Sequence, residues 1–294
     1  MDLFQAILYG ILQGLTEFLP ISSSGHLFLL PTLFHWQDAG SGFTAVIQLG
    51  TLAAVLIYFR EDLGRLIGAW FKSLFNAEIR KTQDAKLGWG VFWGTLPIMV
   101  LGFLLKDQID TTFRNAYIVG TTLIVFGILM GVAEKVGTQK RDIKEMETKD
   151  GLIMGLWQCL ALVPGSSRSG STITGGLFGG MTREAAARFS FLLSVPSIFI
   201  SGIYKLYSER HSLLESGKTE TIVATVVSFI VGYAAIAFLM KFLQTKSTMV
   251  FVYYRVALGL LVLGLAFGGM IEIQPKKIGE TKPVTRIQHN VIPS

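Results

Sequence analysis

Two polar stretches interrupt an otherwise apolar chain: QGLTEFLPISSSGH at residues 13–26 and PGSSRSGST at residues 164–172. The apolar segments on either side of each stretch are shorter than the roughly 20 residues that a helix needs to cross a bilayer. Polar, non-helical backbone survives at membrane depth only where it is buried in protein or lines a wet cavity. We therefore predict two re-entrant helix–loop–helix hairpins, over residues 3–36 and 151–181.

The composition is that of a membrane protein. Hydrophobic residues make up 51% of the 294 residues and charged residues only 16%, with a mean hydropathy of +0.52, whereas soluble domains carry about 25% charged residues. The net charge of +6 is explained by Lys and Arg in cytoplasmic loops, so we expect no nucleic acid partner. One Cys and four scattered His exclude an internal disulfide and a zinc site. The N-terminus lacks a basic region before its apolar run, so we interpret it as retained structure and not as a signal peptide.

Six stretches predict membrane-spanning helices. Four contain no charged residue and the last two contain one arginine each: 41–59, 87–105, 115–133, 221–240, 185–204 and 249–271. Arg188 lies near an end of its span, where its side chain can reach the membrane surface. Arg255 lies deeper, and both a snorkelling side chain and a buried structural partner remain open for it. Segment 61–75 interleaves apolar and basic residues, which favours a helix along the cytoplasmic interface.

The two hairpins are related by a shift of 145 residues. The shift superposes identical residues in six places: Gly10 on Gly155, Gln13 on Gln158, Leu15 on Leu160, Ser22 on Ser167, Ser24 on Ser169 and Gly25 on Gly170. We divide the chain into a first repeat at 1–145, a second at 146–273 and a polar tail, expected to be disordered, at 274–294. Each repeat holds one hairpin and three spans, and because three is odd, the second repeat is inverted in the membrane. The predicted fold is an all-α polytopic membrane protein with an inverted-topology repeat, about six transmembrane helices and two re-entrant hairpins.

Loop charge predicts the orientation. Loops 60–86, 134–150 and 241–248 share one side and carry thirteen Lys and Arg, whereas loops 106–114 and 205–220 carry five. The first group is therefore expected in the cytoplasm, which places both termini in the periplasm.

Three ionisable residues lie within the hairpins, Glu17, His26 and Arg168, and intramembrane ionisable residues indicate a functional site. Gln13 and Glu17 are four residues apart and share one helix face. Glu17 has three interpretations: a ligand of a divalent cation, an acid or base, and an ion-pair partner of Arg168. His26 is interpreted as a base beside a nucleophilic serine or as a buried, hydrogen-bonded imidazole.

Both loops carry groups that bind phosphate. The hydroxyls and the glycine of residues 22–26 can bind phosphate oxygens or cap a helix. In residues 164–172 a guanidinium lies among hydroxyls before the N-terminus of a predicted helix, which also favours phosphate. The predicted substrate-binding residues are Gln13, Ser22, Ser24, Gly25, Ser167, Ser169 and Thr172. At the reactive positions the two halves of the chain carry different residues. The shift of 145 residues superposes Glu17 on Leu162, Ser23 on Arg168 and His26 on Ser171. We infer a catalytic centre at the pseudo-twofold axis.

At these residues the sequence closely resembles the undecaprenyl-diphosphate phosphatase family of bacitracin-resistance proteins (BacA type). The matching motifs are QGLTEFLPISSSGH (13–26), PGSSRSGST (164–172), FTAVIQLGTLAAV (43–55) and ARFSFLLSVP (187–196). The resemblance implies a multi-pass enzyme of the bacterial inner membrane that hydrolyses a polyprenyl diphosphate lipid, undecaprenyl diphosphate, to the monophosphate. It also implies a divalent cation, Mg²⁺ or Ca²⁺, and an active site that faces the periplasm.

Residue by residue, the resemblance implies catalytic roles for Glu17, Ser23, His26 and Arg168. Gln13 stands where many family members carry a second glutamate, which leaves Glu17 as the only carboxylate to hold the metal ion. We expect Ser23 as the nucleophile with His26 as base or acid, while a phosphohistidine and direct attack by water remain open, as does a homodimer. A lipid flippase that uses the same inverted-repeat site is the rival interpretation. An acid-phosphatase-like lipid phosphatase shares the SGH triplet, but its lysine–arginine and arginine–histidine motifs are absent from the sequence.

Overall fold

The computed structural model describes residues 1–34, 36–208, 218–271 and 273–274. In chain order the elements are α1 (Leu3–Phe18), α2 (Ser23–Leu33), α3 (Gly40–Tyr58), α4 (Arg60–Ser73), α5 (Ala77–Arg80), α6 (Gln83–Leu104), α7 (Lys106–Asp110), α8 (Ala116–Val136), η1 (Ile143–Glu145), α9 (Thr148–Cys159), η2 (Leu160–Leu162), α10 (Arg168–Phe178), α11 (Arg183–Ser208), α13 (Lys218–Thr245) and α14 (Met249–Phe267). No β-strand occurs among the described residues, where one isolated bridge joins Arg141 to Met181. The predicted tail lies outside the described residues from 275 onward.

The long helices confirm a polytopic membrane protein. In the part of the chain that the structure describes, five helices are long and apolar enough to cross a bilayer: α6, α8, α11, α13 and α14. A sixth span results if α3 and α4 are taken together, although the two are bent by 81°. The six predicted spans coincide with α3 and these five helices to within five residues at each end. Segment 61–75 largely coincides with α4, which turns sharply away from α3, and its place along the cytoplasmic interface stays a prediction.

The two helix–loop–helix units lie where the polar stretches predicted them, and both break in the same way. Ser22 precedes α2 and Ser167 precedes α10, with positive φ angles of 76° and 68°. Each hydroxyl caps its helix by accepting a hydrogen bond from a glycine N–H three residues on, that of Gly25 at 3.2 Å or Gly170 at 3.1 Å. The local backbone therefore repeats with the shift of 145 residues.

Equivalent arms of the two hairpins pack against long helices from the opposite half of the chain. α1 lies against α13, and α9 lies against α6. Glycines bring these backbones into contact, because a Cβ at Gly10 would overlap the carbonyl oxygen of Ala224 and one at Gly155 would overlap that of Gly94. Small residues that allow such close approach are typical of helix contacts in membranes. Since Gly10 and Gly155 are equivalent under the shift, the two contacts are equivalent as well, while the inversion of the second repeat stays a prediction.

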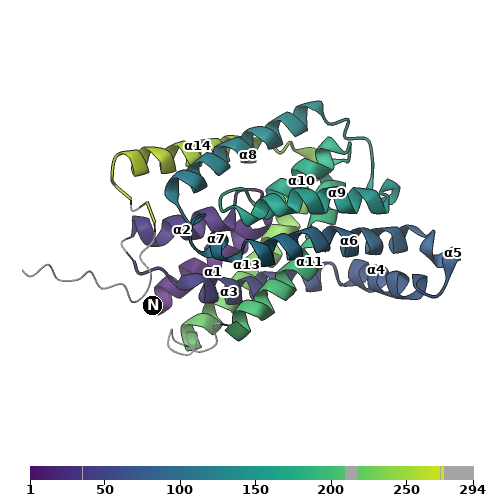
Figure 1. Cartoon of the computed structure of the whole chain (residues 1–294), viewed down its shortest axis with the longest axis horizontal. Coiled ribbons are helices and arrows are strands. Elements are labelled where there is room, and N and C mark those ends of the chain that lie inside the picture. Colours follow the sequence, from purple (N-terminus) through teal and green to yellow (C-terminus); the bar gives the residue numbers. More distant parts are fainter. Residues whose placement is uncertain (35, 209–217, 272, 275–294) are drawn as a thin grey trace, which may run out of the picture.

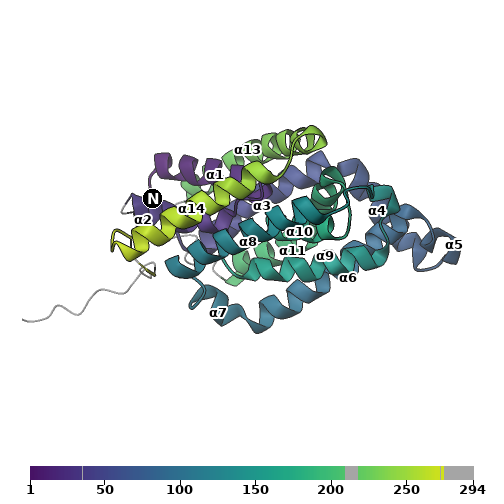
Figure 2. The ribbon, with the colours of Figure 1, turned by 90° about the horizontal axis from the view of Figure 1, so that it is seen from above.

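α8 and α14 complete the bundle beside the hairpins. They lie side by side in both views of the molecule (Figures 1 and 2). α10 packs against α8, α9 and α11, and α2 packs against α1 and α8. Both second arms are therefore enclosed by long helices, which protects the polar loops before them from the hydrocarbon of the bilayer.

Candidate active site

Glu17 and Arg168, the hairpin residues of opposite charge, form an ion pair. Arg168 Nη2 donates to Glu17 Oε1 at 2.8 Å. Glu17 lies in the last turn of α1 and Arg168 begins α10, so the pair joins the two hairpins. The side chain of Glu17 is 4% exposed and that of Arg168 is 14% exposed, so the guanidinium is the more accessible partner. The structure thus brings the predicted acid and the predicted guanidinium into direct contact.

The other carboxylate oxygen of Glu17 binds two groups of its own hairpin. Gln13 Nε2 and the Ser23 hydroxyl both donate to Glu17 Oε2, each at 2.9 Å. Gln13 lies one helical turn before Glu17, whereas Ser23 is the first residue of α2 and is brought back by the break between the helices. The proton of the Ser23 hydroxyl points at a carboxylate, which is the geometry in which a base activates a serine nucleophile.

The oxygen atoms around Glu17 fit a hard divalent cation. Mg²⁺ and Ca²⁺ take oxygen ligands, and Mg²⁺ is commonly held by one or two carboxylates together with substrate phosphates. Glu17 supplies a carboxylate and Ser23 a hydroxyl, and the buried Oε1 of Gln13 has no hydrogen-bond partner among the described residues. In the same part of the chain no group of three or more His, Cys, Asp or Glu is placed to hold a metal. Such a site would therefore need ligands in addition to these protein oxygens.

The second arms of both hairpins direct their N-termini at the ion pair. α2 begins at Ser23 and α10 begins at Arg168, and both of these residues contact Glu17. The unpaired first-turn N–H groups and the helix dipole favour an anion at such a point. Two helix N-termini and one guanidinium thus converge on one place, which is the chemistry of a phosphate site.

Hydrogen bonds hold the two loops against each other. The Gly165 N–H donates to Ser24 Oγ at 3.3 Å, and the Ser169 hydroxyl donates to the Leu19 carbonyl oxygen at 3.2 Å. Both loops also pair their own hydroxyls at the same separation of 3.2 Å, Ser22 with Ser24 and Ser167 with Ser169. The serines of the two motifs therefore fix the loops before any substrate is bound.

Arg255 of α14 holds the loops from behind. It is fully buried, and its guanidinium donates to the carbonyl oxygens of Ser166 at 2.7 Å and Gly165 at 3.1 Å. It also contacts the carbonyl oxygens of Leu123 and Pro20. Carbonyl groups in a broken helix have no helical partner and need a donor inside the membrane. Of the two interpretations left open by the sequence, the buried partner is confirmed and the snorkelling side chain is wrong.

Both ring nitrogens of His26 bind groups other than Ser23. Nδ1 lies 2.7 Å from the Ser22 carbonyl oxygen and Nε2 lies 2.6 Å from the Tyr254 hydroxyl. A carbonyl oxygen only accepts, so Nδ1 carries the proton and Nε2 of the neutral ring accepts from Tyr254. The geometry is that of the buried, hydrogen-bonded imidazole, and the role of His26 as base or acid stays a prediction.

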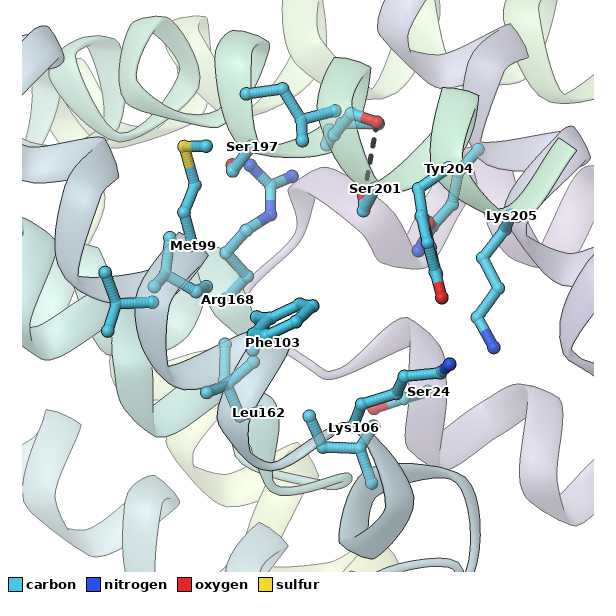
Figure 3. Close-up of a pocket in the computed structure, with 18 of the residues that line it drawn as sticks. Ser24, Met99, Phe103, Lys106, Leu162, Arg168, Ser197, Ser201, Tyr204 and Lys205 are labelled. Carbon is cyan, nitrogen blue, oxygen red and sulfur yellow. Dashed lines mark hydrogen bonds between the residues drawn. The ribbon is translucent and has the colours of Figure 1, made fainter. Parts of the chain in front are cut away.

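A cavity of about 770 Å³ opens at the ion pair (Figure 3). Five of the predicted site residues line it: Glu17, Ser23, Ser24, Ser167 and Arg168. The remaining six are buried and do not line it: Gln13, Ser22, Gly25, His26, Ser169 and Thr172. The Thr172 hydroxyl, for example, donates to the Arg168 carbonyl oxygen. The motifs thus supply one layer of residues that face the cavity and a second layer that positions the first.

Comparison with known proteins identifies the family. The family described as bacitracin resistance protein BacA matches residues 6–261. This chain belongs to the BacA family. A protein named undecaprenyl-diphosphatase from Thermobifida fusca is 50% identical over 271 residues, which cover 92% of each chain. One of the same name from Prosthecochloris aestuarii is 50% identical over 281 residues, 92% of this chain and 100% of the relative. Undecaprenyl-diphosphatase 2 from Streptomyces avermitilis is 46% identical over 286 residues, 92% of this chain and 97% of the relative.

The cavity of this BacA-family protein has walls that the motifs did not predict. Apolar residues of α6 and α11 form much of them: Ile98, Met99, Val100, Phe103, Leu104, Ile198 and Ile200. Polar residues outside the two hairpin motifs also line it: Gln48, Lys106, Ser197, Ser201, Tyr204 and Lys205. Single polar side chains inside otherwise apolar spans, such as Gln48, are the sequence signal that could have found some of them. Tyr254 gave no such signal, because tyrosine is common at membrane interfaces.

Proposed function

We propose that this protein hydrolyses undecaprenyl diphosphate to undecaprenyl phosphate and inorganic phosphate at the cavity that Glu17 and Arg168 line. The proposal is carried by one observation, the buried ion pair with its adjacent serine hydroxyl in the wall of a largely apolar cavity. The polar groups around the ion pair suit a diphosphate and the apolar walls suit a polyprenyl chain. Membership of the BacA family and close relatives named undecaprenyl-diphosphatase support this choice of lipid.

The walls offer the lipid a lateral path from the bilayer. Phe103 of α6 is 79% exposed and also lines the cavity, as do the exposed Val100 of the same helix and Ile200 of α11. Apolar side chains that belong both to the outer surface and to the cavity allow a polyprenyl chain to remain among lipid tails while its head group enters. The head group then meets Arg168 and the two helix N-termini.

The chemistry follows from the contacts of Ser23. We propose that Ser23 Oγ attacks the terminal phosphorus while its proton passes to Glu17, because the hydroxyl already donates to Glu17 Oε2 at 2.9 Å. The bond from that phosphorus to the bridging oxygen breaks, and its electron pair leaves with undecaprenyl phosphate. Arg168 and the first-turn N–H groups of α2 and α10 stabilise the charge on the transferring phosphoryl oxygens.

A second step restores the enzyme. Water attacks the phosphoserine, the P–Oγ bond breaks, and inorganic phosphate forms while Ser23 Oγ regains a proton from Glu17. The proton of the attacking water passes to the phosphate product. In this scheme His26 orients Ser22 and the start of α2, and a phosphohistidine is the alternative that trapping of the phosphoenzyme tests.

A divalent cation is proposed as part of the site. Glu17, the Oε1 atom of Gln13 and the Ser23 hydroxyl would hold Mg²⁺ or Ca²⁺ together with the substrate phosphates. Such an ion, when bound, neutralises phosphate charge and polarises the phosphorus. We also propose that the site faces the periplasm of a bacterial inner membrane, on the basis of the excess of Lys and Arg in the opposite loops.

The decisive experiment is phosphate release by purified protein in detergent, where no second leaflet exists. Long and short polyprenyl diphosphates are compared with and without chelator, for the wild type, Arg168→Ala, Ser23→Ala and, as a control, Arg60→Ala, whose side chain is 67% exposed. We expect Arg168→Ala to lose at least about 100-fold in turnover and Arg60→Ala to retain it. A folded wild type that moves the lipid between leaflets of a vesicle but releases no phosphate in detergent would be a flippase, and the proposal would be wrong. A Ser23→Ala enzyme with full turnover would remove Ser23 as the nucleophile.

A further inference from the structure

Four serines of α11 lie along one face of that helix. They follow each other at spacings of three or four residues, which keeps side chains on one side of a helix: Ser190, Ser194, Ser197 and Ser201. The first two are buried, and the last two line the cavity. The polar face of α11 therefore continues from the packed interior into the cavity.

The packing of α10 on α11 places Ser197 at the level of Arg168. Two contacts fix the register, in which residue numbers rise on one helix as they fall on the other: Gly176 with Ala186, and Thr172 with Ser190. Continued by one turn, this register puts Arg168 opposite Ser194, and Ser197 lies one turn further along α11. Figure 3 shows the side chain of Arg168 reaching toward Ser197. A phosphoryl group held by Arg168 would thus lie near Ser197.

The hydroxyl proton of Ser197 is used within the protein. Its Oγ lies 3.0 Å from the Ser194 carbonyl oxygen and 3.4 Å from Gln158 Oε1, and both of these atoms only accept hydrogen bonds. Because a serine hydroxyl has one proton and two acceptor sites, Ser197 offers acceptor sites to the cavity. The Ser201 hydroxyl likewise donates to the Ile198 carbonyl oxygen at 3.2 Å. Phosphate oxygens need donors, so this wall suits water better than phosphate.

The amide of Gln158 adds an unpaired donor beside Ser197. Gln158 is fully buried, and its Nε2 has no hydrogen-bond partner among the residues that the structure describes. Buried groups of this kind are normally satisfied by bound water, which is a second indication that water binds here. Gln158 is also the equivalent of Gln13 under the shift of 145 residues. In each hairpin the repeated glutamine therefore contacts a residue that lines the cavity, Glu17 in the first and Ser197 in the second.

We propose that Ser197 binds the water that hydrolyses the phosphoserine, and that Gln158 is a positioning residue for Ser197. The inference rests on the proposed function, whose second step needs this water. The attacking and leaving oxygens of a phosphoryl transfer lie roughly in line, so the water must approach from the side away from Ser23 Oγ. Figure 3 shows Ser24, the neighbour of Ser23, across the cavity from Ser197.

The role of Ser197 is orientation and not proton transfer. Its Oγ accepts a hydrogen bond from the water, which directs a lone pair of the water oxygen at the phosphorus. As the new P–O bond forms, the bond from phosphorus to Ser23 Oγ breaks, and Oγ keeps the electron pair and takes its proton from Glu17. Both protons of the water end on the phosphate product, and Ser197 keeps its own proton.

The test compares Ser197→Ala with Ser197→Thr, which keeps a hydroxyl, and with Gln158→Leu. Ser194→Ala is the matched control, because Ser194 donates to its own helix in the same way but is fully buried and does not line the cavity. Undecaprenyl diphosphate is hydrolysed in dodecyl maltoside. Undecaprenyl phosphate, inorganic phosphate and phosphoserine are each measured after rapid quenching, and thermal unfolding is measured on the same preparations.

We expect the loss to fall on the second step alone. Ser197→Ala should lower kcat about tenfold through lost orientation of the water. Its kcat/KM should stay within about twofold of the wild type, because undecaprenyl phosphate leaves before the water is needed. Undecaprenyl phosphate should then appear in a burst ahead of inorganic phosphate, while phosphoserine accumulates. Ser197→Thr should restore kcat, Gln158→Leu should show the same pattern more weakly, and Ser194→Ala should match the wild type.

Several results would overturn the inference. One is a Ser197→Ala enzyme with the kcat and the phosphoserine level of the wild type. Another is an equal fall of kcat and kcat/KM without a burst, because Ser197 would then hold the lipid head group or support the fold. Should Ser197→Ala not fold, Gln158→Leu must lower kcat without lowering kcat/KM for the inference to stand. An active wild type that forms no phosphoserine in any variant would refute this inference alone, whereas a wild type that releases no phosphate would refute the proposed function.

Discussion

The imidazole of His26 and the hydroxyl of Tyr254 are joined by a hydrogen bond of 2.6 Å, and their rings stack with centroids 5.7 Å apart. This contact connects the first turn of α2 to α14, 228 residues away in the sequence. Because Nδ1 of the same ring donates to the Ser22 carbonyl oxygen, the ring links α14 to the residue whose positive φ angle turns the chain into α2. His26 therefore helps to determine where Ser23 lies.

We predict that His26 and Tyr254 act as one unit in stability. Tyr254→Phe leaves Nε2 of a buried imidazole without its donor and costs about 1 kcal/mol of unfolding free energy. His26→Ala removes the same bond, so the double variant should lose less than the sum of the two single losses. The unfolding free energies of the three variants are compared by thermal unfolding in detergent. Tyr253→Phe is the control, because Tyr253 is 67% exposed. Additive losses would show that the two residues are not coupled.

Arg255 gives a second prediction, in which stability and activity fall together. Arg255→Met leaves the carbonyl oxygens of Gly165 and Ser166 buried without their donor, which costs about 3 kcal/mol or more. Arg255→Lys keeps the charge, but a single ammonium cannot reproduce the planar fork that reaches several carbonyl groups, so it should restore only part of the loss. Thermal unfolding and phosphate release are measured on the same preparations, with the exposed Arg60→Met as control. Full activity of Arg255→Met would show that the loops keep their position without the guanidinium.

Much of the arrangement could be predicted from the sequence because membranes restrict what polar residues can do. A polar break between short apolar runs has few solutions in a bilayer, and both hairpins lie where the breaks predicted them. The contact of Glu17 with Arg168 could be anticipated because few opposite charges lie within the hairpins. The partners of Arg255 could not, since every carbonyl group looks the same in a sequence. The contact of His26 with Tyr254 could not either, because helix periodicity does not say which face of a distant helix meets the site.

A third prediction concerns the metal ion and uses the repeat for its control. Gln13→Glu adds a carboxylate beside Glu17, and two buried carboxylates repel each other unless a cation lies between them. We expect this variant to be destabilised in chelator and to gain more thermal stability from Mg²⁺ than the wild type gains, because a ligand that binds the folded state stabilises it. In the second hairpin the position equivalent to Glu17 is Leu162, so the equivalent change, Gln158→Glu, adds a carboxylate without a second one at that position and should show no gain from Mg²⁺. An equal response of both variants to Mg²⁺ would place the cation elsewhere.

The close contact of the two halves gives the last prediction. A Cβ at Gly155 of α9 would overlap the backbone of Gly94 in α6, and backbone cannot move aside as a flexible side chain can. Gly155→Ala should therefore cost about 1–3 kcal/mol through overpacking, and Gly10→Ala, its equivalent on α1, should lower stability as well because its Cβ would meet the Ala224 carbonyl oxygen. Gly64→Ala in α4 is the matched control, since nothing lies within 4 Å of its Cβ and alanine favours a helix over glycine by about 0.5–1 kcal/mol. The midpoint temperature of thermal unfolding in detergent should therefore fall for Gly155→Ala and rise for Gly64→Ala. A Gly155→Ala protein as stable as the wild type would mean that α9 does not pack backbone to backbone on α6.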